Sequence, residues 1–367
     1  MKKRRLGRTN LNVSVIGFGG EWVIPSSVEY ACKMYERALD LGITYFDAAR
    51  IYGNVEEKLG MALEDVRDKV VIATKTHHLF DPDAARVGLK QSLRNLRTDR
   101  VDIVIVQHID NEKTLEQFMG ENSALSVLKE ARSQGKLDFI GLSGHKPYVL
   151  AKAIRTGEFD MILAPFNIIN REVTEELLPL AKKLDVGVAS MKTFGGPDQR
   201  FIQCELSKIV PEKAEFNRIF GEGNIRTERA LRYVLAHDVH TAVCGLSTIE
   251  EVESAAKVGE KFTGLTQKEK AEVRFGGLPL SPFCRDCGLC LRCPEGLKIP
   301  LILVLDKYFT YYGITDWSRE VYERLAVKVD SCSKCAECEP KCPYELPVIE
   351  MLNRAHERLS KQKKANV

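Results

Sequence analysis

Short apolar segments alternate with amphipathic helical patterns through residues 13–258, and this alternation restricts the fold more than any other feature of the sequence. A short hairpin is expected to lead from the start of the chain into the first strand. Strands are expected at 13–19, 44–48, 70–74 and 101–107, and near residues 137, 161, 187 and 241. Helices are expected at 28–41, 55–64, 81–96, 123–134, 172–184, 227–237 and 249–258, with another beginning at residue 147. Eight such alternations favour one closed barrel over an open, doubly wound sheet. The sequence therefore predicts an α/β fold, a (β/α)8 TIM barrel.

Polar side chains stand at the ends of three of these strands. Asp47 closes the strand at 44–48, Lys75 follows the strand at 70–74, and His108 follows the strand at 101–107. Tyr52 lies in the loop just after Asp47. Because the loops at the carboxyl ends of barrel strands share one face, these four titratable groups are expected to meet there.

A phenol, an ammonium, a carboxylate and an imidazole together suit proton transfer. Tyrosine has an ordinary pKa of about 10, which is too high for efficient proton exchange near neutrality. An ammonium favours the phenolate, and a carboxylate can hold that ammonium in place, so Lys75 and Asp47 are expected to serve Tyr52. Taken singly, each residue could instead be a cap, a surface charge, a rim group or a packing residue. Their common position at strand ends favours a catalytic site.

Composition and charge restrict the class of partner. The chain has 367 residues, 44% of them hydrophobic, and a formal net charge of only +3 from 54 basic and 51 acidic residues. Such a balance does not favour nucleic-acid or membrane binding. The basic start is followed by neither a long apolar core nor a cleavage site, and no segment approaches the roughly 20 apolar residues that span a bilayer. A cytoplasmic protein with a small-molecule substrate is expected.

Cysteine is concentrated near the end of the chain. Two runs hold eight of the eleven cysteines: Cys284, Cys287, Cys290 and Cys293, and then Cys332, Cys335, Cys338 and Cys342. The second run, followed by Pro343, has the CxxCxxCxxxCP spacing of bacterial ferredoxins. Two [4Fe-4S] clusters are favoured over zinc, because zinc sites usually draw on separated ligand pairs. A single cluster and a zinc site are the alternatives. The composition change predicts a barrel domain at 1–278 and an iron-sulfur domain at 279–367.

The second domain is expected to be mainly helical. Residues 301–329 have a helical pattern with a break at 312–314, and another helix is expected from residue 348. In two-cluster ferredoxins the last cysteine of each run ligates the other cluster. That rule would place Cys342 with the first run and Cys293 with the second. The first run has two residues, not three, before its last cysteine, so uncrossed ligation remains an alternative.

The chain closely resembles the aldo/keto reductase family from its first residues through the eighth strand. The segment FDAARIYGN matches the family's Asp and Tyr spacing, VIATK matches its lysine and VIVQH matches its histidine. The resemblance implies that Asp47, Tyr52, Lys75 and His108 form the catalytic tetrad of a nicotinamide-dependent oxidoreductase. The tail is similar to that of a subgroup with a C-terminal ferredoxin-like domain.

The resemblance also implies a cofactor site at later strand ends. The implied residues are Ser143, Asn167, Met191, Lys192, Phe194, Gly195, Leu246, Ser247 and Glu251. Met191 stands where many members stack an aromatic ring on the nicotinamide. Glu251 lies near the position where members often carry an arginine for the 2′-phosphate. Because a carboxylate repels a phosphate, NADP and NAD are both candidate cofactors.

Carbonyl reduction or alcohol oxidation at the barrel is the favoured function. A nicotinamide moves two electrons together whereas a [4Fe-4S] cluster moves one, so the clusters are expected to be structural or to serve an external electron-transfer protein. An electron-transfer module with little carbonyl turnover and a redox sensor that binds nucleotide are the two alternatives. Trp22 is a candidate for lining the substrate pocket, with packing in the core or at the rim as the alternative.

Overall fold

The computed structural model describes residues 1–76, 80–121, 123–168, 170–194, 227–268, 284, 290, 292–342 and 344–360. The chain divides into two compact units. The first comprises Met1–Gly195 and Ala230–Lys270, and the second comprises Gly196–Arg229 and Ala271–Val367.

The first unit is a closed barrel of parallel strands. In spatial order the strands are β10 (Thr241–Gly245), β3 (Ile16–Gly19), β4 (Tyr45–Asp47), β5 (Val71–Thr76), β6 (Val101–Val106), β7 (Leu137–Ser143), β8 (Met161–Pro165) and β9 (Gly187–Met191). The ring closes through parallel pairing of β10 with both β3 and β9. All six residues of β5 and all six of β6 are buried, as expected for strands covered on both faces. The predicted (β/α)8 barrel is confirmed.

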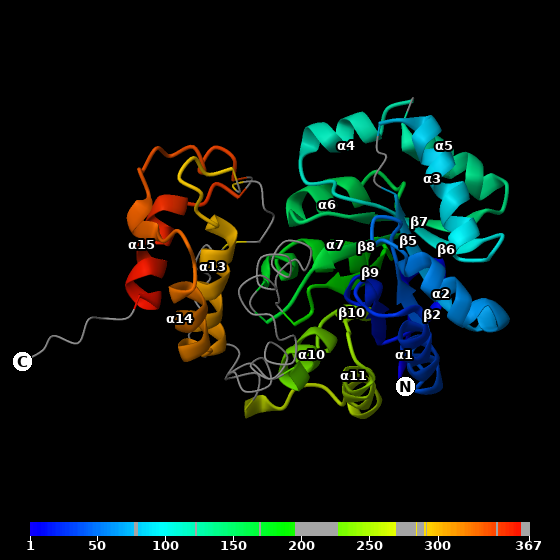
Figure 1. Ribbon diagram of the computed structural model, residues 1–367. Helices are drawn as coiled ribbons and strands as arrows, with labels where there is room; N and C mark the ends of the chain where they lie inside the picture. Colours follow the sequence, from blue (N-terminus) through cyan, green and yellow to red (C-terminus); the bar gives the residue numbers. More distant parts are fainter. Residues whose placement is uncertain are drawn as a thin grey trace, which may run out of the picture. The chain divides into compact units, whose positions relative to one another are not determined.

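Helices lie outside the strands (Figure 1). They are α1 (Val28–Asp40), α2 (Val55–Leu63), α3 (Pro82–Asn95), α5 (Ala124–Ser133), α6 (Pro147–Ile154), α7 (Leu177–Lys183), α10 (Thr227–Leu235) and α11 (Ile249–Lys261). Several begin at a side chain that accepts a hydrogen bond from the first turn: Ser27 for α1, Asp81 for α3 and Thr248 for α11. These caps satisfy backbone N–H groups that have no partner within the helix.

A hairpin closes the amino-terminal end of the barrel. It is formed by β1 (Lys3–Arg5) and β2 (Asn12–Ser14), which pair antiparallel. Leu6 and Val13 are fully buried and belong to the hydrophobic cluster inside the barrel. Gly7 has φ +51°, and a Cβ there would lie 2.4 Å from the backbone nitrogen of Gly187, so only glycine fits. The hairpin expected at the start of the chain is confirmed. The expected strand at 13–19 is wrong in part, because residues 12–14 belong to the hairpin.

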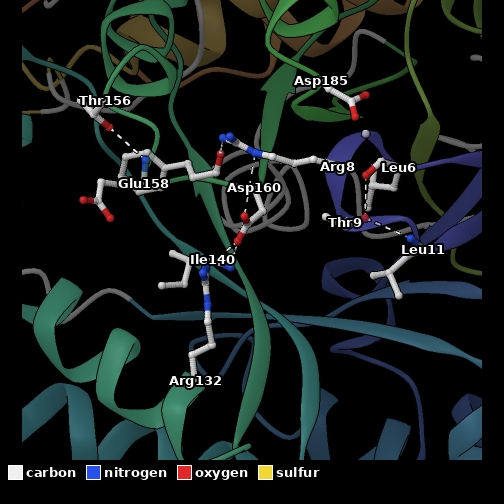
Figure 2. A network of polar contacts seen from close by, with 12 residues as sticks. Leu6, Arg8, Thr9, Leu11, Arg132, Ile140, Thr156, Glu158, Asp160 and Asp185 are labelled. Carbon is white, nitrogen blue, oxygen red and sulfur yellow. Dashed lines mark hydrogen bonds and ion pairs between the residues drawn. The ribbon is translucent and has the colours of Figure 1, made fainter.

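A polar network holds this end of the barrel together (Figure 2). The Asp160 carboxylate accepts hydrogen bonds from the Arg132 guanidinium at 2.7 Å and from the backbone N–H of Ile140 at 2.9 Å. Arg8 lies 3.9 Å from the same carboxylate, and donates to the carbonyl of Phe159 at 2.5 Å. Asp160 thus connects the segment after the hairpin's first strand to β7 and α5.

Two local expectations are corrected. An additional helix, α4 (Glu112–Phe118), follows β6, and Asn111 caps it by accepting from the N–H of Thr114. The helix expected at 172–184 is instead a short 3-10 turn, Glu172–Thr174, followed by α7. The inserted α4 matters for the site, because it begins directly after the loop that carries His108.

The regular structure in the described part of the second unit is helical. They are α13 (Ile299–Lys307), which runs into a π-helical turn at Tyr308–Tyr312, α14 (Thr315–Glu323), the 3-10 turn Val329–Ser331 and α15 (Val348–Leu359). Gly313 has φ +70° and ends the π-helical turn, which confirms the break expected at 312–314. Tyr322 and His356 join α14 to α15 through a 2.6 Å contact between the hydroxyl and Nδ1. Within the described residues, no helix is long and apolar enough to cross a membrane.

Candidate active site

A buried ion pair lies at the carboxyl-terminal end of the barrel. Lys75, in β5, donates from Nζ to the carboxylate of Asp47 at the end of β4, and also to the carbonyl of Ala48 at 3.0 Å. The two side chains are only 2% and 6% exposed. Burial raises the pKa of the Asp47 carboxyl, and the Lys75 ammonium counteracts that rise. Strands β4 and β5 bring these groups together because they are neighbours in the sheet.

Tyr52 packs against this ion pair. Its ring centroid lies 4.8 Å from Lys75 Nζ, and the residue is 6% exposed. The loop after β4 holds it in place, since its backbone N–H donates to the Ala49 carbonyl at 2.9 Å and its carbonyl accepts from Val55 at 3.3 Å. The structure therefore brings three of the four predicted tetrad residues into direct proximity.

His108 lies in the loop after β6 with two further ionisable residues. Its Nδ1 is 4.0 Å from the Asp110 carboxylate, and its ring stacks on that of His145 with centroids 5.8 Å apart. His145 Nδ1 lies 3.2 Å from the same carboxylate, and its backbone N–H donates to Asp110 as well. His108 has φ +64°, a left-handed conformation that is uncommon outside glycine.

Asp110 and His145 were not predicted from the sequence. The signal for them was their position: Asp110 lies two residues beyond His108 in the loop after β6, and His145 lies two residues beyond Ser143, which ends β7. The hydrogen bond with His145 and the two nearby imidazoles lower the pKa of Asp110 despite its partial burial. The mouth of the barrel therefore carries a carboxylate–imidazole cluster in addition to the predicted residues.

The expected cofactor residues occupy the remaining strand ends. Ser143, Asn167, Leu246 and Ser247 are all buried. The Asn167 amide donates to the carbonyl of Lys192 at 2.9 Å, which joins the loops after β8 and β9. Among the others, Met191 ends β9, Phe194 is half-buried, and Gly195 lies outside the described residues.

Glu251 has a clear structural role in the loop after β10. Its carboxylate accepts from the backbone N–H of Ser247 at 2.6 Å and from the Ser247 hydroxyl at 2.9 Å. The hydroxyl of Thr248 in turn accepts from the Glu251 N–H at 3.2 Å. This arrangement is close to a capping box, in which an acidic side chain in the first turn reaches back to the N-terminus of its helix. Glu251 thus fixes the loop and places a negative charge beside Ser247.

Trp22 lies next to the end of β10. A Cβ at Gly245 would come 2.2 Å from the Trp22 indole nitrogen, so the ring occupies the space that a side chain would need. The segment that carries Trp22 is held by Lys58, which is 1% exposed and donates to the carbonyls of Val23 and Ile24 at 3.0 Å each. Trp22 is partly exposed, which fits a pocket or rim position better than the core.

The second cysteine run forms a curled loop in the second unit. Lys334 and Ala336 adopt positive φ angles of 57° and 60°, which bend the chain between successive cysteines. Burial raises the pKa of the Cys338 thiol most, and the neighbouring Cys332 and Cys335 add to that rise. Each thiolate in such a group makes it harder for its neighbours to lose a proton. Bound iron ions would neutralise these charges, so the arrangement is compatible with an iron site.

The first cysteine run is described only in part. Cys284 is 8% exposed, and Cys290 and Cys293 are partly exposed. Cys287 lies outside the described residues.

Comparison with protein families gives two matches that together span both parts of the chain. The model of the aldo/keto reductase family matches residues 15–274. The model of a 4Fe-4S dicluster domain matches residues 283–347.

Individual relatives agree with the first match. The chain is 31% identical over 300 residues to L-galactose dehydrogenase of Arabidopsis thaliana, which covers 74% of this chain and 92% of the relative. It is 25% identical over 286 residues to an uncharacterised oxidoreductase of Bacillus subtilis, covering 69% and 89%.

Solved structures show the same fold. The holo form of an aldo-keto reductase from Bacillus halodurans superposes with a TM-score of 0.62 at 24% identity, over 78% of this chain and 99% of that one. An aldo/keto reductase from Klebsiella pneumoniae, in complex with NADP and acetate, superposes with a TM-score of 0.58 at 21% identity, over 77% and 98%.

Proposed function

Since the chain belongs to the aldo/keto reductase family of oxidoreductases, we propose that it interconverts a carbonyl and an alcohol, with Tyr52 as the proton donor and acceptor. The observation that carries this proposal is the buried Asp47–Lys75 ion pair directly beneath the Tyr52 ring. An ammonium next to a phenol favours the phenolate, and this ammonium is itself held by a carboxylate that has almost no access to water. The arrangement makes a phenol suitable for proton exchange near neutrality.

His108 has the second role at the reacting oxygen. It lies in the loop after β6, the strand next to the one that carries Lys75, and its side chain is 44% exposed. An imidazole N–H there can donate a hydrogen bond to the substrate oxygen. Tyr52 would then exchange the proton while His108 orients the oxygen.

A nicotinamide dinucleotide is the proposed cofactor, and when bound it supplies or accepts the hydride. The chemistry of the loops after β7 to β10 fits it, because hydroxyl and amide groups of Ser143, Asn167 and Ser247 lie at these strand ends. Phosphate sites in this fold commonly lie at the loops after the seventh and eighth strands. The Klebsiella relative holds NADP. The Glu251 carboxylate beside Ser247 disfavours a 2′-phosphate, so NAD is retained as the alternative.

The eight cysteines of the second unit are proposed to hold two [4Fe-4S] clusters, which supply one-electron transfer when bound. The match to a dicluster domain supports two clusters, and the curled loop at 332–338 supports iron ligation by the second run. Cys342 with the first run and Cys293 with the second is the proposed crossing. The clusters would either stabilise the second unit or pass electrons to a partner protein.

Steady-state kinetics test the proposed reaction. The cluster-loaded protein, prepared anaerobically, is assayed for oxidation of NADPH and of NADH with small aldehydes. It is also assayed for reduction of NADP+ and of NAD+ with hexoses, because the Arabidopsis relative is named as a dehydrogenase of L-galactose. Tyr52→Phe is expected to lower kcat by about 100-fold or more, the usual contribution of a positioned acid–base group. Tyr148→Phe, which alters a tyrosine 49% exposed on α6, is the matched control and should retain full turnover. An equal kcat for the Tyr52→Phe variant and the native enzyme would contradict the proposal.

An electron-transfer function with little carbonyl turnover is the second candidate, favoured by the match to a dicluster domain. To distinguish electron transfer from carbonyl reduction, the anaerobic protein is mixed with reduced nicotinamide nucleotide in the absence of a carbonyl substrate. Bleaching of the cluster absorption under these conditions supports electron transfer from nucleotide to cluster. Unchanged absorption, together with rapid carbonyl reduction, supports the reductase.

A further inference from the structure

The side chains of His108, Asp110 and His145 converge at the mouth of the barrel, and we propose that they form a binding site for a divalent transition-metal ion of the zinc type. One ligand atom from each residue lies within 4.8 Å of the other two. The Asp110 carboxylate is central, because it lies 3.2 Å from His145 Nδ1 and 4.0 Å from His108 Nδ1. Two imidazoles and one carboxylate are ligands that zinc commonly takes in proteins.

The spacing of the three groups suits one ion. Two atoms bound to the same zinc ion at about 2.1 Å can lie at most about 4.2 Å apart. Both distances from the carboxylate are within this limit. The His108 side chain is 44% exposed and can turn by the small amount that brings the third distance within range.

The backbone holds the loops after β6 and β7 in this arrangement. A Cβ at Gly144 would lie 2.3 Å from the carbonyl oxygen of Ile109. Glycine at position 144 therefore allows the two loops to approach more closely than a residue with a side chain would. The Ile109 N–H donates to the Ser143 carbonyl at 3.0 Å, and the His145 N–H donates to Asp110. The carboxylate and both imidazoles are therefore carried by a joined pair of loops, which limits the conformational entropy lost on binding an ion.

Occupation of this site has a consequence for the proposed reaction, on which this part of the inference rests. Once Nδ1 of His108 binds a metal, the imidazole is fixed towards Asp110 and carries an additional positive charge. The imidazole can then no longer turn to donate its hydrogen bond to the substrate oxygen. Zinc is therefore expected to inhibit carbonyl turnover, and its removal by a chelator to restore it.

Calorimetric titration with Zn²⁺ tests the site directly, using cluster-loaded protein so that the cysteines are occupied by iron. His145→Phe is expected to lose one equivalent of bound zinc, and Asp110→Asn to bind that equivalent at least ten-fold more weakly. His145→Gln is a second variant at the same position that leaves a polar side chain. Iron content measured after each titration shows that zinc has not displaced iron.

Two control variants separate this site from other histidines. His240→Asn alters a half-buried histidine beside Val188, and the double variant His77→Gln/His78→Gln alters the two that follow Thr76 in the sequence. Both controls should bind zinc as the native enzyme does. The site is overturned if His145→Phe, His145→Gln and Asp110→Asn all bind zinc as tightly as the native protein, or if only the His77/His78 variant loses binding.

Binding and inhibition are measured separately. Zinc binding that depends on Asp110 and His145 supports the site even if carbonyl turnover proves absent, in which case the proposed function alone fails. Zinc binding at these residues with unchanged turnover contradicts the inhibitory consequence.

Discussion

Lys75 and Asp47 form an ion pair that is almost completely removed from water, and the Tyr52 ring lies against its ammonium. Burying two charges is costly unless their geometry is good and further hydrogen bonds satisfy them. Lys75 meets this condition in part through its second hydrogen bond, to the Ala48 carbonyl. A buried pair of this kind adds little net stability compared with apolar residues in its place. Its presence therefore indicates a function that requires a fixed charge.

A double-mutant cycle should show this coupling. Asp47→Asn and Lys75→Met are each expected to lower the free energy of unfolding by about 3–5 kcal/mol, because each leaves one buried group without its partner. The double variant should lose clearly less than the sum. Urea denaturation of the cluster-loaded protein measures all four states. The exposed pair Lys33–Glu29 is the matched control, and Lys33→Met should leave the free energy of unfolding close to the native value. Additive losses at Asp47 and Lys75 would contradict the pairing.

The network at the amino-terminal end should affect stability without affecting turnover. Asp160→Ala removes the acceptor of the Arg132 and Ile140 hydrogen bonds. A loss of about 3 kcal/mol in unfolding free energy is expected, because hydrogen bonds to charged groups contribute about 1.5–3 kcal/mol each and the 39% exposure of Arg132 favours the low end for the two bonds. The kcat at a temperature well below unfolding should be unchanged, because Asp160 lies at the opposite end of the strands from Lys75. A large drop in kcat with intact stability would contradict this separation.

The stability of the barrel should fall as the pH falls below about 6.5. Burial lowers the pKa of His240 below its ordinary value of 6.5, and its Nδ1 accepts the N–H of Val188 at 2.9 Å, which requires the neutral imidazole. The unfolded chain binds a proton near pH 6.5 that the folded state excludes, so stability present above that pH is lost as pH falls towards the folded pKa. His240→Asn keeps an acceptor without a titrating group. It should reduce the slope by up to about 1.4 kcal/mol per pH unit in urea denaturation at pH 5 to 7. Identical slopes in the native and His240→Asn proteins would refute a role for this imidazole.

Nucleotide preference should depend on the charge of Glu251. Glu251→Gln keeps an acceptor for Ser247 but removes the negative charge, and it should raise NADPH affinity relative to NADH about five-fold, or about 1 kcal/mol. Fluorescence titration with both reduced nucleotides gives the ratio. Glu253→Gln is the control, because Glu253 is paired with Arg37 on the exposed side of the same helix. The same nucleotide ratio in native, Glu251→Gln and Glu253→Gln proteins would show that Glu251 does not face the 2′-phosphate.

Much of the barrel could be predicted because its strands are covered on both faces and therefore appear as apolar runs. The ends of these runs located Asp47 and Lys75, since neighbouring parallel strands present their ends on one face. The hairpin was predicted, but the boundary between it and the first barrel strand was misplaced because Val13 and Val15 continue an apolar run across a change of strand. Helix α4 was missed because it is only two turns long and buries just Leu115 and Phe118.

The cluster around Asp110 could not be predicted in the same way. Its geometry depends on the close approach of two loops, which Gly144 permits, and glycine is common in loops of many kinds that make no such contact. His145 also lies beyond the strand end, where side-chain direction depends on the turn and not on strand alternation. Sequence patterns located the strand ends, but the contacts between the loops required coordinates.

The central claim, that Tyr52 exchanges the proton, is tested most directly by the single-turnover rate of hydride transfer with nucleotide already bound. Tyr52→Phe should slow that step by about 100-fold or more while the Kd for nucleotide stays within about two-fold of the native value. Tyr148→Phe should change neither quantity. A Tyr52→Phe enzyme that transfers hydride at the native rate would contradict the proposed role of the phenol.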